Sequence, residues 1–168
     1  MKTRISGRVW KYGDDVNTDV IFPGKYTYSI SDRKEMAKHA LEDLDPGFVA
    51  NVQPGDIIVA GKNWGCGSSR EQAVTCLKEA GVGAIVARSF ARIYYRNSIN
   101  EALPIVTCDA VDGVEAGEEI TIDFVAGKVT TPRGEYAFPP LPREVMEIIE
   151  AGGLIAYVQR QVQATAKA

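Results

Sequence analysis

The residues best suited to chemistry lie in one short segment, residues 61–73, which reads GKNWGCGSSREQA. Two adjacent hydroxyls, Ser68 and Ser69, are followed directly by the guanidinium of Arg70. Backbone N–H groups clustered at a glycine-rich turn, together with a guanidinium fork, make an anion site that can bind a carboxylate through two hydrogen bonds. The segment therefore predicts a carboxylate-binding turn.

The position of Arg70 favours an anionic partner. In the first turn of the helix that we expect here, the helix dipole is unfavourable to a cation. The partner is either a substrate carboxylate or, within the chain, Glu71. A purely structural interpretation is also open, in which the glycines make a tight turn and Ser68 with Glu71, or Ser69 with Gln72, forms a capping box.

Other catalytic and metal-binding patterns fit poorly. His39 is the only histidine and lies on a predicted surface helix, and the GxSxG motif is absent, so a Ser-His-Asp hydrolase is disfavoured. The cysteines, Cys66, Cys76 and Cys108, are ten or more positions apart, which fits neither a disulfide set nor a CxxC metal site. Residues 15–26 imitate the start of a calcium loop but lack its glycine and its bidentate glutamate.

Composition and charge exclude several classes of protein. The chain has 168 residues, 45% of them hydrophobic, which suffices for one sizeable core and excludes intrinsic disorder. Nineteen Lys and Arg against 22 Asp and Glu give a net charge of -3, without the basic face that nucleic acid requires. No signal peptide and no membrane-spanning apolar run is present. We expect one cytoplasmic domain over residues 1–168, with residues 159–168 frayed, and neither nucleic-acid nor membrane partners.

The elements that must position residues 61–73 alternate between strands and helices. A strand is expected at 5–10, and a helix at 32–44 between an Asp32/Glu35 capping box and Pro46-Gly47. Three continuous apolar runs are typical of strands buried on both faces: residues 57–60, 84–87 and 105–107. Helices are expected between them, at 73–80 and about 90–97. This order predicts parallel pairing, with residues 61–73 at the strand end where α/β sheets bind ligands.

The last third of the chain changes character. Residues 120–124 and 128–131 predict a hairpin, with a possible third strand at 135–138. Helical spacing returns between residues 145 and 158. The fold class is therefore α/β, with a mixed, partly parallel sheet flanked by helices and a C-terminal hairpin region.

Three segments, in this order, resemble the small subunits of the 3-isopropylmalate dehydratase (isopropylmalate isomerase) family. They are residues 15–23 (DVNTDVIFP), 63–71 (NWGCGSSRE) and 89–97 (SFARIYYRN). The resemblance covers nearly the whole chain and implies the swivelling β/β/α domain of the aconitase C-terminal type. It implies a hydro-lyase subunit, inactive alone, that interconverts 2-isopropylmalate and 3-isopropylmalate by dehydration and rehydration in leucine biosynthesis.

The same resemblance implies a division of labour with a large partner subunit, in a heterodimer or heterotetramer. The large subunit would carry a [4Fe-4S] cluster, and this chain, whose cysteines are dispersed, would bind neither cofactor nor metal. Carried over by position, Ser68 would act as an alkoxide and remove the proton alpha to a carboxylate. Ser69 and Arg70 would hold carboxylate oxygens of a small di- or tricarboxylate substrate.

The segment Tyr26-Thr27-Tyr28-Ser29 lies where this family selects the side group of its substrate. Homoaconitase-like members resemble Tyr-Leu-Arg-Thr there, and the arginine grips an extra carboxylate; here Tyr28 stands at that position. We therefore expect these four residues to contact an apolar or alkyl group. Three alternatives stay open: ordinary surface aromatics in this loop, a dehydratase of 2,3-dimethylmalate or homoaconitate, and a non-catalytic carboxylate-binding module.

A second departure from the family pattern concerns Gln72. Many relatives have histidine after the Ser-Ser-Arg-Glu sequence, whereas this chain has glutamine. Since glutamine can also serve as the N3 member of a capping box, we expect the local structure to be kept.

Overall fold

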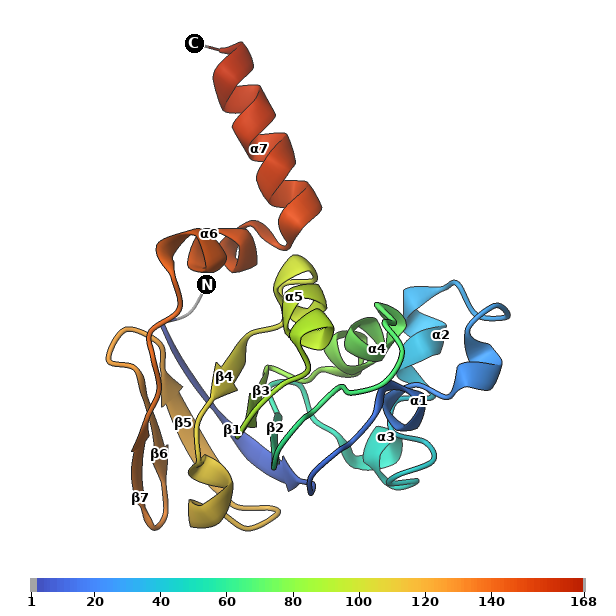
Figure 1. Ribbon diagram of the computed structural model, residues 1–168, viewed down its shortest axis with the longest axis vertical. Helices are drawn as coiled ribbons and strands as arrows, with labels where there is room; N and C mark the ends of the chain where they lie inside the picture. The colour runs from blue at the N-terminus through green and yellow to red at the C-terminus, as the bar shows by residue number, and fades with distance from the viewer. Residues whose placement is uncertain (1–2, 168) are drawn as a thin grey trace.

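One mixed sheet of seven strands organises the chain in the computed structural model, which describes residues 3–167 (Figure 1). The strands are β1 (Arg4–Lys11), β2 (Ile57–Ala60), β3 (Ala84–Ala87), β4 (Ile105–Thr107), β5 (Glu119–Asp123), β6 (Lys128–Thr131) and β7 (Gly134–Ala137). Their order across the sheet is β4-β3-β2-β1-β5-β6-β7. β1 to β4 pair in parallel, whereas β5, β6 and β7 pair antiparallel. The predicted fold class and the hairpin region are therefore confirmed.

The parallel strands β2 and β3 are buried at every position, as their apolar runs predict. Because successive side chains of a strand point to opposite faces, each strand contributes to two cores. Ile58 and Ile85 pack in the core beneath the helices, whereas Ile57 and Val86 pack in the core shared with β5 and β6.

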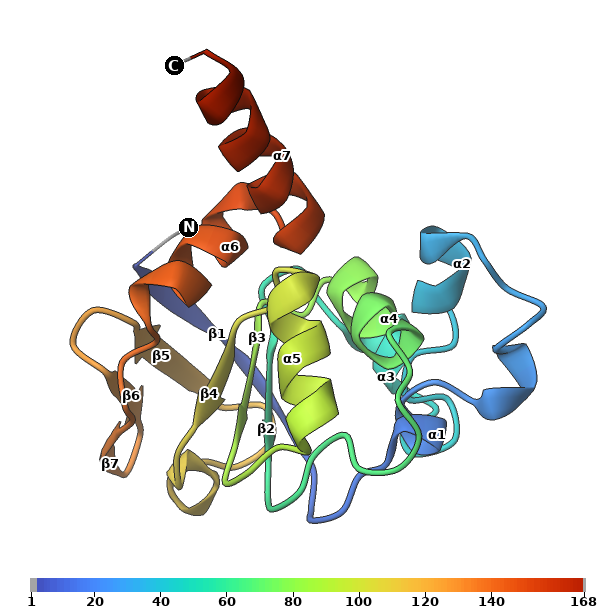
Figure 2. The ribbon, with the colours of Figure 1, turned by 45° about the horizontal axis from the view of Figure 1, so that its top comes forward.

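The helices lie mainly on one face of the parallel strands (Figure 2). They are α1 (Thr18–Ile21), α2 (Arg33–Ala37), α3 (Phe48–Asn51), α4 (Gln72–Ala80), α5 (Arg92–Asn100), α6 (Arg143–Ala151) and α7 (Leu154–Ala166), with 3-10 turns η1 (Gly24–Tyr26) and η2 (Ala110–Gly113). α4 ends at Gly81, whose φ of 108° gives the left-handed cap expected of a C-terminal glycine.

The prediction of one helix over residues 32–44 is wrong about the length of the helix. Asp32 does cap α2 by accepting a hydrogen bond from the N–H of Lys34, but the helix ends at Ala37. Leu41 is buried and adopts a φ of 55°, and its N–H donates to the carbonyl of Ile21 at 2.8 Å. The apolar residues after Ala37 therefore lie in turns instead of a helix. The N–H of Leu41 bonds to the distant Ile21, so it does not form a helical hydrogen bond.

Residues 159–166, which we expected to be frayed, form the C-terminal part of α7. The helix continues through Ala166, and residue 168 lies outside the described residues. Its glutamine, arginine and alanine residues tolerate a helix well, and no glycine or proline interrupts it. In both ribbon views α7 projects from the body of the molecule (Figure 2). Within residues 3–167 no helix is long and apolar enough to cross a membrane.

Candidate active site

Three loops that follow neighbouring parallel strands meet at one edge of the sheet. β1 leads to residues 12–23, β2 to residues 61–71 and β3 to residues 88–91. Because these strands are parallel and adjacent, their carboxyl ends lie side by side, the usual location of ligand sites in α/β folds. The three segments that carry the family resemblance thus converge in space.

Backbone hydrogen bonds join the three loops. The N–H of Gly65 donates to the carbonyl of Val16 at 2.8 Å, and the N–H of Thr18 donates to the carbonyl of Cys66 at 2.9 Å. On the other side of the turn, the N–H of Ala91 donates to the carbonyl of Trp64 at 2.9 Å. The glycine-rich turn is therefore held between the loop after β1 and the loop after β3.

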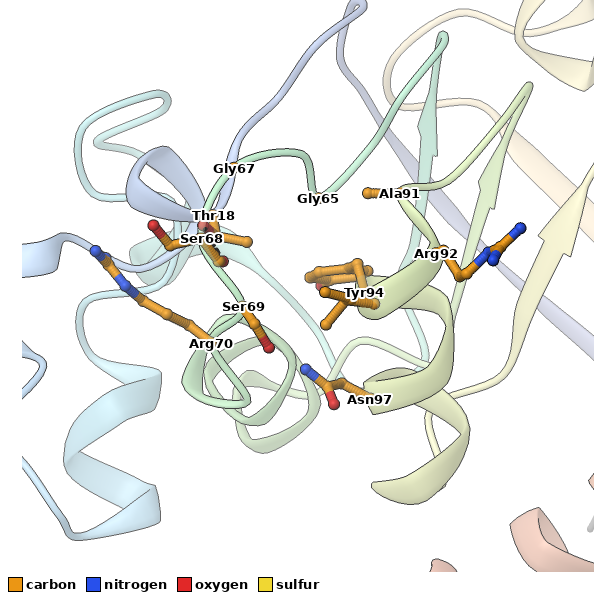
Figure 3. Close-up of a pocket in the computed structure, with 11 residues that line it drawn as sticks. Thr18, Gly65, Gly67, Ser68, Ser69, Arg70, Ala91, Arg92, Tyr94 and Asn97 are labelled. Atoms are coloured by element: carbon orange, nitrogen blue, oxygen red, sulfur yellow. Dashed lines mark hydrogen bonds between the residues drawn. The ribbon is translucent and has the colours of Figure 1, made fainter.

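A cavity of about 210 Å³ lies where the loops meet (Figure 3). It is lined by Thr18, Gly65, Gly67, Ser68, Ser69, Arg70, Ala91, Arg92, Ile93, Tyr94 and Asn97. Figure 3 shows Ser69 pointing toward Asn97, whereas Arg92 points away from the serines. Ser68, Ser69 and Arg70, the three residues predicted from the glycine-rich segment, all line this cavity, and the Arg70 side chain extends away from Ser69 and Asn97.

Gly65 permits the close approach of the turn to α5. Its φ is 81°, and a Cβ atom there would lie 2.2 Å from the ring of Tyr94, so no other residue fits. The Tyr94 ring is buried, and its hydroxyl donates to the carbonyl of Ala73 at 2.9 Å. The buried tyrosine therefore fixes the distance between the turn and both helices that follow the parallel strands.

The serine turn, residues 67–70, is held by a buried threonine on one side and is exposed on the other. Thr18, which is only 2% exposed, donates its hydroxyl to the carbonyl of Ser68 at 2.8 Å. Ser68 and Ser69 are exposed, and within residues 3–167 their hydroxyls have no hydrogen-bond partner. The backbone N–H groups of residues 67–70 likewise have no acceptor in that range. Donors without acceptors, in residues that line a cavity, are suited to an anion.

Arg70 has an anionic partner within the chain, and it is Asp19 instead of Glu71. The Arg70 side chain is 20% exposed, while that of Asp19 is 61% exposed. A Cβ atom on Gly24 would lie 3.0 Å from both Nη1 of Arg70 and Oδ1 of Asp19, so that glycine leaves room for the pair. Glu71 lies elsewhere: burial, and then the neighbouring carboxyl of Glu101, raise the pKa of Glu71.

The capping box expected at the start of α4 does not form. The helix begins at Gln72, its N-cap residue is Glu71, and no side chain caps it. The two serines therefore lie before the first helical turn. Gln72 donates its side-chain N–H to the carbonyls of Thr27 at 3.0 Å and Ile30 at 3.4 Å, because loop 24–30 packs against the helix start.

The loop predicted to select the substrate lies beside the cavity and does not line it. Tyr26 stacks on His39 with ring centres 4.0 Å apart, and its hydroxyl donates to Oε1 of Glu42 at 3.3 Å. Tyr28 and Ser29 point into solvent, and Tyr28 is fully exposed. The connection of this loop to the site runs through Gln72 and through Gly24 beside Arg70. A role in substrate binding for residues 26–29 stays a prediction.

Thr18 and Asn97 were missed as site residues by the sequence reasoning. Both lie in segments that carry the family resemblance, but neither type by itself indicates chemistry. Asn97 follows Tyr94 by three residues and therefore shares its helix face. The predicted parallel order of β2 and β3 was the signal that could have placed that face beside the turn.

The donor set of this chain does not fit an iron–sulfur cluster. Such clusters need several thiolates close together, whereas Cys76 and Cys108 are buried in different cores and Cys66 lies in the turn. Burial raises the pKa of both buried thiols, that of Cys108 to about 11. Among residues 3–167, no group of three His, Cys, Asp or Glu side chains is placed to hold a metal ion.

Comparisons with known proteins agree with the geometry. The family model of the aconitase C-terminal domain matches residues 17–110. The 3-isopropylmalate dehydratase small subunit of Caldicellulosiruptor bescii is 52% identical over 160 residues, 94% of this chain and 96% of that protein. A small subunit from Archaeoglobus fulgidus is 47% identical over 159 residues, with 94% and 96% covered. The crystal structure of 3-isopropylmalate dehydratase (LeuD) from Methanocaldococcus jannaschii superposes with a TM-score of 0.92 at 39% identity, covering 98% of both chains.

Proposed function

This chain belongs to the family of 3-isopropylmalate dehydratase small subunits, and we propose that its serine turn forms half of that hydro-lyase's active site. The reaction is the interconversion of 2-isopropylmalate and 3-isopropylmalate in leucine biosynthesis. One observation carries the assignment of the site: Ser68, Ser69 and Arg70 line one cavity, and the two hydroxyls have no partner within residues 3–167.

We propose that Ser68 removes the proton alpha to a substrate carboxylate. An ordinary serine hydroxyl is far too weakly acidic for this step, so its alkoxide needs stabilisation. The N–H groups of residues 67–70, which lack acceptors in the described chain, are suited to that task. Thr18 supports the geometry, because its hydrogen bond to the Ser68 carbonyl holds the turn in place without using the Ser68 hydroxyl.

Ser69 and Arg70 are proposed to bind a substrate carboxylate. The pairing of Arg70 with Asp19 supports this role, since it demonstrates that a carboxylate fits against the guanidinium. Asp19 is largely exposed and can be displaced or shared when a substrate carboxylate arrives. Ser69 points toward Asn97, so both can contact the same bound group.

The cavity needs a partner surface to become an active site. Its 210 Å³ is smaller than the roughly 300–1,000 Å³ of typical ligand pockets, and the serines on its rim are exposed. We therefore propose that a large subunit closes over it, in a heterodimer or heterotetramer in the cytoplasm. A [4Fe-4S] cluster would belong to that subunit and would supply Lewis-acid chemistry, since the thiols of this chain do not fit one.

We propose a substrate with an alkyl side group and without an additional carboxylate near Tyr28. Tyr28 has no charge to offer, and within loop 24–30 the only cation, Lys25, lies over the ring of Tyr26 at 5.1 Å. A distal carboxylate would therefore lose the charged partner that gives such a group its specificity. Tyr28→Arg should raise activity with homocitrate relative to isopropylmalate, and an unchanged ratio would remove Tyr28 from substrate selection.

The deciding experiment is to co-express the chain with each candidate cluster-bearing large subunit from its genome and purify the complexes anaerobically. Absorbance of the unsaturated intermediate would then be followed with isopropylmalate, 2,3-dimethylmalate and homocitrate. We expect turnover only in a complex, and fastest with isopropylmalate. Turnover fastest with another acid would reassign the substrate. Carboxylate binding without turnover in any complex would instead identify a non-catalytic binding module.

A further inference from the structure

Loop 24–30 contains the residues predicted to select the substrate, yet few polar contacts attach it to the rest of the chain. Tyr26 is held through its ring and its hydroxyl, and the N–H of Ile30 donates back to the Tyr26 carbonyl at 3.1 Å, within the loop itself. Tyr28 is fully exposed, and the buried hydroxyl of Thr27 has no hydrogen-bond partner in the part of the chain that the structure describes. The side chains beyond Tyr26 therefore give the loop no polar attachment.

The side chain of Gln72 supplies this attachment. Its Nε2 atom donates to the carbonyl of Thr27 at 3.0 Å and to that of Ile30 at 3.4 Å. Among the described residues no other donor bonds either carbonyl. A side-chain amide carries two N–H groups on one nitrogen, so it can bond both carbonyls at once. Gln72 therefore ties the loop backbone to the start of α4 at two points.

α4 gives this attachment a rigid base. Gln72 is the first residue of the helix, and the five residues that follow it, 73–77, are all buried. Closely packed interiors deform little, so the helix start keeps its place above the sheet. The Gln72 side chain is itself half-buried. The loop is therefore held at a set distance from the core.

The other half of the same loop lies against Arg70. A Cβ atom on Gly24 would lie 3.0 Å from Nη1 and 3.2 Å from Nη2 of Arg70, so the loop backbone passes close beside the guanidinium. Arg70 and Gln72 are only two residues apart in the chain. One short segment thus carries the guanidinium and also holds the loop, and any shift of the loop would change its position relative to Arg70.

We propose that Gln72 is a positioning residue that determines which side group of the substrate is accepted. The inference rests on the proposed function, in which Arg70 binds a carboxylate and residues 26–29 contact the side group. Gln72 does not touch the substrate; it fixes the distance between these two parts of the site. An apolar pocket distinguishes substrates that differ by one methylene only about 10- to 200-fold, so a small shift of the loop is enough to lose most of that discrimination.

Gln72→Met removes both donors and keeps a side chain of similar length. In a complex that shows turnover, KM for isopropylmalate should rise about 10-fold, while kcat changes less than about threefold because Ser68 is untouched. Malate, which has the same two carboxylates and no side group, reports on the carboxylate contacts alone. Its inhibition constant should stay within about twofold of wild type. Equal weakening of isopropylmalate and malate would mean a general disturbance at Arg70 and would overturn the proposal.

Gln72→Glu keeps the shape of the side chain but replaces the donor with an acceptor, so KM for isopropylmalate should rise at least as much as in Gln72→Met. A wild-type KM in Gln72→Glu would contradict the role of the donor. Gln53→Met is the matched control, because Gln53 is exposed and its side chain has no hydrogen bond within residues 3–167; its kinetics should match wild type.

The wild-type complex separates two kinds of failure. If it shows no turnover with any large subunit, the proposed function fails, and the role of Gln72 fails with it. If it turns over and Gln72→Met leaves KM for isopropylmalate unchanged, only the role of Gln72 fails.

Hydrogen exchange on the isolated chain tests the attachment without turnover. Because the N–H of Ile30 bonds within the loop, loosening the loop should speed exchange of that amide about fivefold or more in Gln72→Met. The amide of Ile85, in β3, should exchange as in wild type, and circular dichroism verifies folding. Unchanged exchange at Ile30 would mean that Gln72 does not hold the loop and would overturn the proposal.

Discussion

A turn in the antiparallel half of the sheet and a turn in the parallel half differ in whether their polar groups have hydrogen-bond partners. In the antiparallel half, the turn after β5 satisfies itself: Oδ1 of Asp123 accepts from the N–H groups of Val125 and Ala126 at 3.0 and 2.9 Å. In the parallel half, the N–H groups of residues 67–70 lack acceptors within the described chain, and the serine hydroxyls beside them do too. The turn after β5 thus satisfies its own polar groups, whereas the serine turn leaves its polar groups available.

Topology explains this difference. An antiparallel hairpin needs only a short turn, which closes its own hydrogen bonds. A parallel pair needs a crossover, so each strand must end in a loop that leaves the sheet at the same edge. Three such loops gather after β1, β2 and β3, and they hold one another through backbone contacts while one turn stays open. We therefore expect substitutions in the open turn to affect turnover, and those in the antiparallel half to affect stability.

The largest effect is expected from Ser68→Ala. Turnover of the assembled enzyme should fall by about 10²–10⁴-fold, the range for loss of a general base, with substrate binding nearly intact. The melting temperature should not change, because the Ser68 hydroxyl is exposed and has no partner within residues 3–167. The control Ser6→Ala removes an exposed serine that bonds Thr121 at 2.7 Å and should leave turnover unchanged. Near wild-type turnover in Ser68→Ala would rule out the serine as the base.

The opposite behaviour is expected from Ile122→Ala in β5. Ile122 is fully buried in the core that β5 and β6 share with the parallel strands, so the truncation should lower the free energy of unfolding by about 2–5 kcal/mol. Turnover at temperatures well below the melting transition should match wild type. Denaturant titration and a kinetic assay on the same preparation measure both quantities. A large drop in turnover of the folded variant would show that the two halves are coupled.

Arg70→Lys should lower kcat/KM by about 10- to 100-fold, because lysine cannot reproduce the two parallel hydrogen bonds of a guanidinium to a carboxylate. The matched change in the antiparallel half is Arg133→Lys, at a residue that pairs with Glu118 at 2.7 Å. We expect no kinetic effect there. Steady-state kinetics on both variants decides the comparison, and equal values would remove Arg70 from the substrate-binding residues.

The smallest effect is expected from Asp56→Asn, where β1 and β2 meet. Burial raises the pKa of Asp56, but hydrogen bonds from the N–H of Gln53, the indole of Trp10 and the guanidinium of Arg8 outweigh it, so the net pKa lies below its usual value. A lowered folded-state pKa stabilises the protein above the unfolded pKa of about 3.9, and this contribution is lost as the pH falls through the folded pKa.

Replacing the carboxylate should therefore cost about 1–3 kcal/mol at pH 7, with a smaller difference from wild type below about pH 4. Urea unfolding of both proteins at pH 7 and at pH 3 measures the change. A difference of the same size at both pH values would contradict the assignment of this carboxylate as the titrating group.

Several features of the fold were predictable because their signals are local. The apolar runs at 57–60 and 84–87 indicate strands buried on both faces, and the structure pairs them in parallel. The chemistry-bearing turn was also visible, since hydroxyls, a guanidinium and glycines are adjacent in sequence. Helix boundaries were less accurate: the spacing over residues 32–44 could not reveal that the backbone of Leu41 bonds to Ile21.

The residue types available at the site, and the strands that lead to them, follow from local patterns in the sequence, because composition and periodicity act over a few neighbouring residues. The partners of these residues depend on the three-dimensional packing of the chain. Arg70 meets Asp19, Gln72 holds Thr27, and Asn97 joins the serine turn. Each of these partners lies tens of residues away along the chain, and packing brings it within reach. Such contacts depend on how strands and loops are ordered in space, which no local pattern encodes.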